Sequence, residues 1–143
     1  MSTLDSLKKI SSHPLAEFIL FDEAQKELFL THAVPLLNSG YSIGCISSSI
    51  AKALDVNLKP TEIEDVYTLA YPVDAPSILC FSSGTKNNQK GIIRTYTSWK
   101  ESFAIIMKHI GVDERLRGVV IGALPYSLSL FGVMESLFRE KKP

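Results

Sequence analysis

A stretch of hydroxyl, glycine and lysine residues near the middle of the chain has the composition of an anion-binding loop. It runs from Ser82 to Gly91 with the sequence S-S-G-T-K-N-N-Q-K-G. The backbone N–H groups and hydroxyls of such a loop can surround one oxyanion, and a lysine adds a positive charge. Gly84 and Gly91 allow a positive φ and close approach of a ligand. Phosphate is the anion that this chemistry suggests.

Two apolar runs flank the loop and must hold it. Ile78 to Phe81 has the length and composition of a buried strand, and Ile92 to Tyr96 is a second β-type run. We therefore predict a strand, a loop and a second strand in succession. This order excludes a Walker loop, in which the lysine follows the glycine and a helix comes next. The alternative without function is a polar hairpin loop with an incidental lysine.

The order [ST]-S-G-T-x-x-x-x-K-G resembles the signature loop of the adenylate-forming superfamily. This superfamily includes acyl- and aryl-CoA ligases, luciferases and the adenylation domains of peptide synthetases. Its usual form is S-G-T-T-G-x-P-K-G, which Ser83-Gly84-Thr85 and Lys90-Gly91 match in spacing. Three positions depart from it: Lys86 stands for the second Thr, Asn87 for the middle Gly and Gln89 for the Pro.

A second resemblance lies about thirty residues downstream, between Gly118 and Gly132. There the family has an apolar strand that ends in Leu-Pro, an aromatic or small residue, and a Gly that opens a helix. Ala123-Leu124-Pro125-Tyr126-Ser127 is similar to that landmark, and Leu128 stands where a His is often found. By resemblance, Tyr126, Ser127 and Leu128 would border the acyl pocket. The resemblance covers about Ser77 to Phe138.

The resemblance implies an enzyme that activates a carboxylic acid with ATP as an acyl-adenylate and passes the acyl group to a thiol. The acceptor would be coenzyme A or a carrier-protein phosphopantetheine, and Mg²⁺ would accompany the nucleotide near Thr85 or its neighbours. No catalytic residue and no metal ligand is assigned in this sequence. The residues implied to bind the ATP phosphates are Ser82, Ser83, Gly84, Thr85, Lys90 and Gly91.

The family's adenine- and ribose-binding segments, its hinge and its small C-terminal domain follow the Leu-Pro landmark, and none has a counterpart here. We therefore expect this chain to be an incomplete N-terminal part of an acyl/aryl-CoA ligase-like enzyme, of the AMP-forming acid–thiol ligase type once completed. The missing C-terminal part would belong to the same or another chain. Because a truncated sheet leaves an unpaired edge or an apolar face, we also expect the isolated chain to be either poorly soluble or a homo-oligomer.

Two alternatives stay open. The departures at Lys86, Asn87 and Gln89 suggest a non-catalytic binding or assembly module that kept the fold and lost adenylation. The second alternative is an unrelated α/β domain whose loop binds another phosphate or nothing. A topology that puts the loop outside a strand–loop–strand context would favour this last interpretation.

Composition sets the general class of protein. The 143 residues are 45% hydrophobic and 21% charged, which is typical of an ordinary globular domain. Fifteen Lys and Arg balance fifteen Asp and Glu, so the overall charge does not indicate nucleic acid as a partner. Met1 to Ser12 lacks the apolar core of a secretory signal, and no apolar run is long enough for a membrane span. We expect a cytoplasmic protein.

The predicted fold class is α/β, with a largely parallel sheet flanked by helices, resembling part of the large N-terminal domain of adenylate-forming enzymes. Residues 1–143 would be a single, partial AMP-binding-type domain. Residues 1–76 would be a helical part and connector without an assigned motif, and 77–138 would contain both landmarks.

Several local features accompany that outline. Helices are predicted over Ser2–Ser12, from Asp22 to the Asn38-Ser39-Gly40 stop, and over Tyr41–Asp55, where apolar residues have helical spacing. A connector is expected over Asn57–Ala75, and within it Thr61-x-x-Glu64 has the form of a capping box. Ser98-x-x-Glu101 would open a helix over Trp99–His109, and Val119–Leu124 would be a buried strand.

The two cysteines, Cys45 and Cys80, lack metal-site spacing. Cys80 lies within the predicted strand Ile78–Phe81. We interpret it as a buried free thiol rather than as a nucleophile or half of a disulfide.

Overall fold

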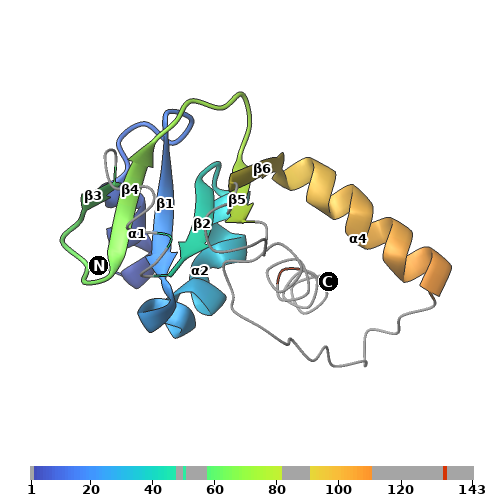
Figure 1. The fold of residues 1–143 in the computed structure, drawn as a ribbon, viewed down its shortest axis with the longest axis horizontal. Coiled ribbons are helices and arrows are strands. Elements are labelled where there is room, and N and C mark those ends of the chain that lie inside the picture. The colour runs from blue at the N-terminus through green and yellow to red at the C-terminus, as the bar shows by residue number, and fades with distance from the viewer. Residues whose placement is uncertain (1, 48–49, 51–57, 82–90, 111–133, 135–143) are drawn as a thin grey trace.

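A computed structural model describes residues 2–47, 50, 58–81, 91–110 and 134, and every structural statement below concerns those residues. They form one mixed sheet with helices (Figure 1). The strands are β1 (Glu17–Asp22), β2 (Ser42–Ile46), β3 (Leu58–Pro60), β4 (Val66–Ala70), β5 (Ser77–Phe81) and β6 (Gly91–Thr95). The helices are α1 (Thr3–Ile10), the short 3-10 helix η1 (Glu23–Gln25), α2 (Lys26–Asn38) and α4 (Tyr96–Ile110).

The strand order in the sheet is β3-β4-β1-β2-β5-β6. The three central strands, β1, β2 and β5, are parallel to one another. The outer pairs β1–β4, β3–β4 and β5–β6 are antiparallel. The described part of the chain is mixed α/β, with parallel pairs at the centre of the sheet and antiparallel pairs at its margins. A largely parallel sheet stays a prediction, because the strand expected over Val119–Leu124 lies outside the described residues.

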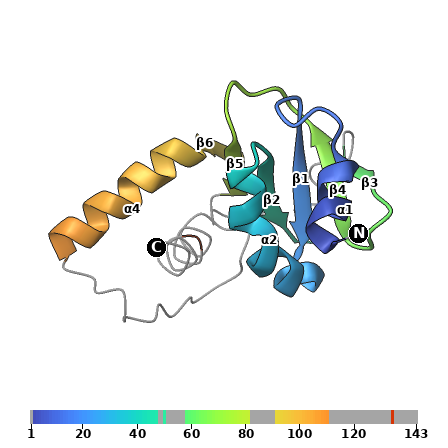
Figure 2. The same ribbon diagram turned by 180° about the vertical axis from the view of Figure 1, so that it is seen from behind.

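The two apolar clusters lie on opposite faces of the sheet. Helices α1 and α2 cover one face, as the view from behind shows (Figure 2). Leu7 of α1 and Phe29 of α2 pack there against Ile19, Ile43 and Ile78 of the three central strands. On the other face, a second cluster gathers Phe18, Leu20, Ile46, Ile50, Leu79 and Phe81. The central strands are therefore buried on both sides.

The N-terminal helices begin where their capping residues predict. The Ser2 side chain accepts a hydrogen bond from the Asp5 N–H at the start of α1, and Asp22 accepts one from Ala24 at the start of η1. Helix α2 ends before Gly40, which has a φ of 94° that glycine adopts without strain. The predicted helices at both places are confirmed.

Several predictions for residues 1–76 are wrong. The helix expected over Tyr41–Asp55 does not include Ser42–Ile46, which form strand β2 with all five residues buried. A strand buried on both faces has no polar alternation, so its isoleucines matched a helical spacing by chance. The connector expected over Asn57–Ala75 contains β3 and β4, whose sequence Val-Tyr-Thr-Leu-Ala is typical of a strand.

The expected capping box at Thr61 is also wrong, since no helix follows it. The Thr61 hydroxyl donates to the Val66 carbonyl at 2.8 Å and accepts from the Ile63 N–H at 3.1 Å. Asp65 has a φ of 59°, a conformation that aspartate tolerates better than most residues. These contacts close the turn between β3 and β4.

Candidate functional site

The candidate phosphate loop connects two adjacent strands of the sheet. Strand β5 ends at Phe81 and strand β6 begins at Gly91, and these two residues are paired across the antiparallel ladder. Both predicted strands are thereby confirmed, and residues 82–90 join them in a strand–loop–strand arrangement. Ser82, Ser83, Gly84, Thr85 and Lys90 lie outside the described residues, whereas Gly91 is within them.

Gly91 does not need to be glycine for reasons of packing. A Cβ built on it would lie 3.4 Å from Leu79 Cδ1 and 3.5 Å from Phe81 Cε1, which are ordinary van der Waals contacts. Gly91 lies in the extended strand β6, where antiparallel pairing with Phe81 holds it in the β region, so the positive φ that a glycine allows is not used there.

Strand β5 is fixed on its other side by β2. The Ser42 hydroxyl accepts a hydrogen bond from the Ser77 N–H at 3.0 Å, and both residues are buried at the start of their strands. Farther along, a Cβ on Gly44 would lie 2.8 Å from Leu20 Cδ2 and 2.9 Å from the Leu79 carbonyl oxygen. Gly44 thus lets β1 and β5 approach β2 closely. The position of β5, the strand that precedes the loop, depends on this contact.

A half-buried arginine joins the far end of β6 to helix α4. Arg94 Nη2 donates to Ser98 Oγ at 2.7 Å and to Ser102 Oγ at 3.0 Å, and the guanidinium lies 5.8 Å from the centre of the Trp99 ring. The pair Ile78–Arg94 lies three residues from the loop-closing pair Phe81–Gly91. Arg94 therefore holds α4 against the end of β6.

Helix α4 begins three residues before the expected start. Thr95 Oγ1 accepts a hydrogen bond from the Ser98 N–H at 3.1 Å, which is the geometry of an N-terminal cap. The predicted capping box at Ser98 is therefore displaced, because Ser98 bonds Arg94 instead. The competing hydroxyl of Thr95, at the end of β6, was the signal in the sequence that could have given the correct start.

Neither cysteine is an activated nucleophile in the folded chain at neutral pH. Both thiols are free and buried, as the sequence predicted for Cys80. Burial raises the pKa of Cys45 to about 12, with a further increase from the negative charges of Glu23 and Asp22. Burial also raises the pKa of Cys80 to about 11, although the positive charge of Arg94 acts in the opposite direction. Both groups are protonated at neutral pH and serve as core residues.

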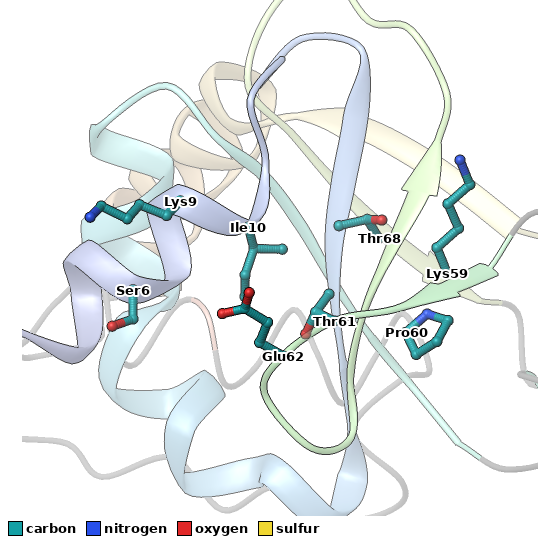
Figure 3. Close-up of a pocket in the computed structure, with 8 residues that line it drawn as sticks. All are labelled: Ser6, Lys9, Ile10, Lys59, Pro60, Thr61, Glu62 and Thr68. Atoms are coloured by element: carbon teal, nitrogen blue, oxygen red, sulfur yellow. The ribbon is translucent and has the colours of Figure 1, made fainter.

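A separate pocket of about 380 Å³ lies at the β3 margin of the sheet, between α1 and the β3–β4 turn. Glu62 and Ile10 meet there, with Lys9 and Lys59 at opposite rims (Figure 3). In the strand order, β3 and β6 are at opposite ends of the sheet. The pocket is therefore distinct from the candidate phosphate loop, and its charged side chains are exposed.

The second landmark cannot be placed in this fold, since Tyr126, Ser127 and Leu128 lie outside the described residues. Within the described ranges, no group of three or more His, Cys, Asp or Glu residues could hold a metal ion. The same part of the chain contains no helix long and apolar enough to cross a membrane.

Comparison with known proteins gives partial similarity to peptide synthetases. The nonribosomal peptide synthetase inpA of Emericella nidulans is 33% identical over 66 residues, which are 46% of this chain and 4% of that protein. Apicidin F synthase of Gibberella fujikuroi is 26% identical over 76 residues, which are 53% of this chain and 2% of that protein. The chain thus spans a small part of the length of these relatives. No family model matches, and no solved structure matches significantly.

Proposed function

We propose that this chain is part of an enzyme that activates a carboxylic acid with ATP as an acyl-adenylate, and that residues 82–91 bind the ATP phosphates. The supporting observation is the pairing of Phe81 with Gly91 at the two ends of the signature-like loop. This is the strand–loop–strand context that the resemblance requires. The partial similarity to a peptide synthetase supports the same class of enzyme.

Rigid strands on both sides of the loop suit this chemistry. When bound, ATP supplies the α-phosphoryl group that the carboxylate attacks, and negative charge develops on the departing pyrophosphate. Donors that are fixed in advance stabilise such charge, because they need no reorganisation during the reaction. We propose that Lys90 supplies a cation, that Ser82, Ser83 and Thr85 supply hydroxyl and backbone donors, and that Gly84 leaves its backbone open to the phosphates.

Gly91 fits a close approach of phosphate oxygens. A side chain at this position would make only ordinary contacts with Leu79 and Phe81, so packing does not explain why the residue is glycine. A ligand that approaches the backbone closely would explain it.

Mg²⁺ commonly binds through one or two carboxylates together with substrate phosphates. We therefore propose that Mg²⁺ enters with the nucleotide and that Thr85 lies near it.

The remainder of the catalytic centre would come from a C-terminal part in the same or another chain. We propose that Tyr126, Ser127 and Leu128 border the acyl pocket, and that coenzyme A or a carrier phosphopantetheine is the acceptor. Completing the enzyme would also complete the sheet. The described edge at β6 suits this, because Ile92 and Ile93 are 38% and 36% exposed there.

The test is ATP–pyrophosphate exchange by the assembly that contains this chain and its C-terminal part. Lys90→Ala removes the proposed cation, and we expect exchange to fall about 100-fold, the scale for loss of one charge-stabilising donor. Lys100→Ala is the matched control, because it removes a lysine that is not part of the loop sequence and that lies over the Tyr96 ring on α4. Exchange that Lys90→Ala leaves unchanged would overturn the phosphate role.

A second candidate function is a non-catalytic binding or assembly module. The three departures from the signature favour it, since Lys86, Asn87 and Gln89 replace a hydroxyl, a glycine and a proline of the usual loop. On this alternative the assembly binds ATP or a partner and gives no exchange with any carboxylic acid. Equilibrium binding of ATP, measured beside exchange on the same preparation, distinguishes the two functions.

A further inference from the structure

The two cysteines of the chain occupy neighbouring positions on adjacent parallel strands. In the β2–β5 ladder, Ile43 is paired with Ile78 and Gly44 with Leu79. One residue farther along both strands stand Cys45 and Cys80, each still within its strand. The register therefore brings the only two thiols of the sequence side by side.

Both side chains also point to the same face of the sheet. Cys45 and Cys80 belong to the cluster that helix α2 covers, together with Ile43 and Ile78. Leu79, between Ile78 and Cys80, belongs to the cluster on the opposite face. Adjacent strands lie about 4.8 Å apart. That spacing is inside the Cα–Cα range of about 4.4–6.8 Å that a disulfide requires.

We infer that Cys45 and Cys80 form a cross-strand thiol pair that a peroxide oxidises to an intramolecular disulfide. One thiol sulfur attacks hydrogen peroxide, the O–O bond breaks, and a sulfenic acid and one water form. The sulfur of the other cysteine then attacks the sulfenic sulfur, the S–O bond breaks, and a second water leaves. The two thiols lose two electrons and two protons, and the peroxide is reduced. This inference does not depend on the proposed adenylation function.

Burial sets the rate of this reaction. Cys45 is 0% and Cys80 is 1% exposed, so the oxidant reaches them only when the margin of the sheet opens locally. Strand β6 contacts one of the two thiols, because Cys80 Sγ donates a weak hydrogen bond of 3.6 Å to the Ile92 carbonyl oxygen. This bond must break before the Cys80 sulfur can bond to Cys45. Oxidation is therefore slow in the folded chain and faster at alkaline pH.

The disulfide would constrain the end of strand β5 that immediately precedes the candidate loop. Cys80 precedes Phe81, which is paired with Gly91 at the ends of the loop. Linking β5 to β2 limits how far this end of the hairpin can separate from the rest of the sheet. Oxidation would thus make the frame of the loop more rigid without occupying the loop itself.

The experiment treats the fully reduced chain, at low protein concentration, with hydrogen peroxide at neutral and alkaline pH. We expect the intact mass to fall by about 2 Da, for the two hydrogen atoms lost, and free thiols counted in denaturant to fall from two to none. Trypsin separates the two cysteines because Lys52 lies between them. The linked peptides 27–52 and 53–86 should therefore be recovered without reduction and disappear on reduction.

Cys45→Ser and Cys80→Ser are matched controls, in which the remaining thiol gains oxygen or links two chains and cannot form the intramolecular bond. If these variants do not fold, the peptide map of the natural chain still decides the question. Separate oxygen adducts on Cys45 and Cys80, or disulfides between chains only, would overturn the inference. Recovery of the linked pair from a monomer supports it.

Discussion

Phe81 and Gly91 face each other across the β5–β6 ladder, and residues 82–90 of the candidate phosphate loop separate them in the sequence. Phe81 is buried in the apolar cluster on the face of the sheet opposite helices α1 and α2, whereas Gly91 is exposed. The hairpin therefore has one end anchored in the core and one end open to a ligand. The first prediction uses this difference.

Gly91→Ala should separate ligand contact from folding. Because the new Cβ would make ordinary contacts, we expect the free energy of unfolding to change by less than about 0.5 kcal/mol. If phosphate oxygens approach the Gly91 backbone, pyrophosphate exchange in the complete assembly should fall about tenfold, which corresponds to about 1.4 kcal/mol. Denaturant unfolding and exchange are measured on the same protein. Unchanged exchange would show that no ligand reaches Gly91.

Gly44→Ala should have the opposite result. Its Cβ would lie 2.9 Å from the Leu79 carbonyl oxygen and 2.8 Å from Leu20 Cδ2, and the backbone oxygen cannot rotate away. We expect a loss of about 1–3 kcal/mol in the free energy of unfolding, as for other overpacked cores. Urea denaturation measures it, with Gly91→Ala as the matched glycine control. Equal stability of the two variants would contradict the close contact at β2.

Arg94→Ala should loosen the junction between β6 and α4. The change removes charged hydrogen bonds to Ser98 and Ser102, and the half-buried position implies a loss of about 1–2 kcal/mol. Arg94→Lys should recover only part of this, because an ammonium cannot make the forked contacts of a guanidinium. Lys100→Ala, which loses one contact with Tyr96, serves as the control. A lysine variant as stable as the natural chain would contradict the assigned role.

Stability should fall at alkaline pH because of the two buried thiols. Their pKa values in the folded chain are raised to about 12 for Cys45 and about 11 for Cys80, against 9.0 for an ordinary thiol. Above pH 9 the unfolded chain releases these protons while the folded chain still holds them. The contribution of the two protonated thiols to the free energy of unfolding is therefore complete below pH 9 and decreases as the pH rises toward 11 and 12.

The measurement for this prediction is urea unfolding at several pH values between neutrality and pH 11, with the upper limit taken from Cys80. A Cys45→Ala and Cys80→Ala double variant is the reference, because it keeps the other alkaline groups, Tyr96 among them. We expect a smaller decrease of stability with pH in the double variant. Parallel curves for both proteins would contradict the raised pKa values.

Ile93→Lys should reduce self-association of the isolated chain. Strand β6 is at the end of the described sheet and carries two exposed isoleucines, whereas the other edge strand, β3, carries Lys59 and Pro60. Lysine and proline discourage pairing at a strand edge, so the two edges differ in protection. Analytical ultracentrifugation measures the change, and Leu15→Lys, at another exposed apolar position, is the control. Identical association of both variants would exclude β6 as the contact.

Local sequence determined the elements whose signals are local. Ser2 and Asp22 carry the hydroxyl and carboxylate that begin helices, and Gly40 ends one. The run from Ser77 to Phe81 is a buried strand, and a polar loop bounded by a second β-type run predicted the hairpin that the structure contains. Such features depend on residues a few positions apart, so they can be inferred without knowledge of the fold.

Only the tertiary structure decided which strands are neighbours. It also decided where two neighbouring strands approach so closely that the residue between them must be small. Ser42–Ile46 is a strand because β1 and β5 pair with it on both sides, and Gly44 is needed because Leu20 and Leu79 approach it there. Cys45 and Cys80, far apart in sequence, each directly follow a residue of the paired Gly44 and Leu79. Strand pairing is set by long-range burial and hydrogen bonding, which overrides the local spacing of apolar residues in a short segment.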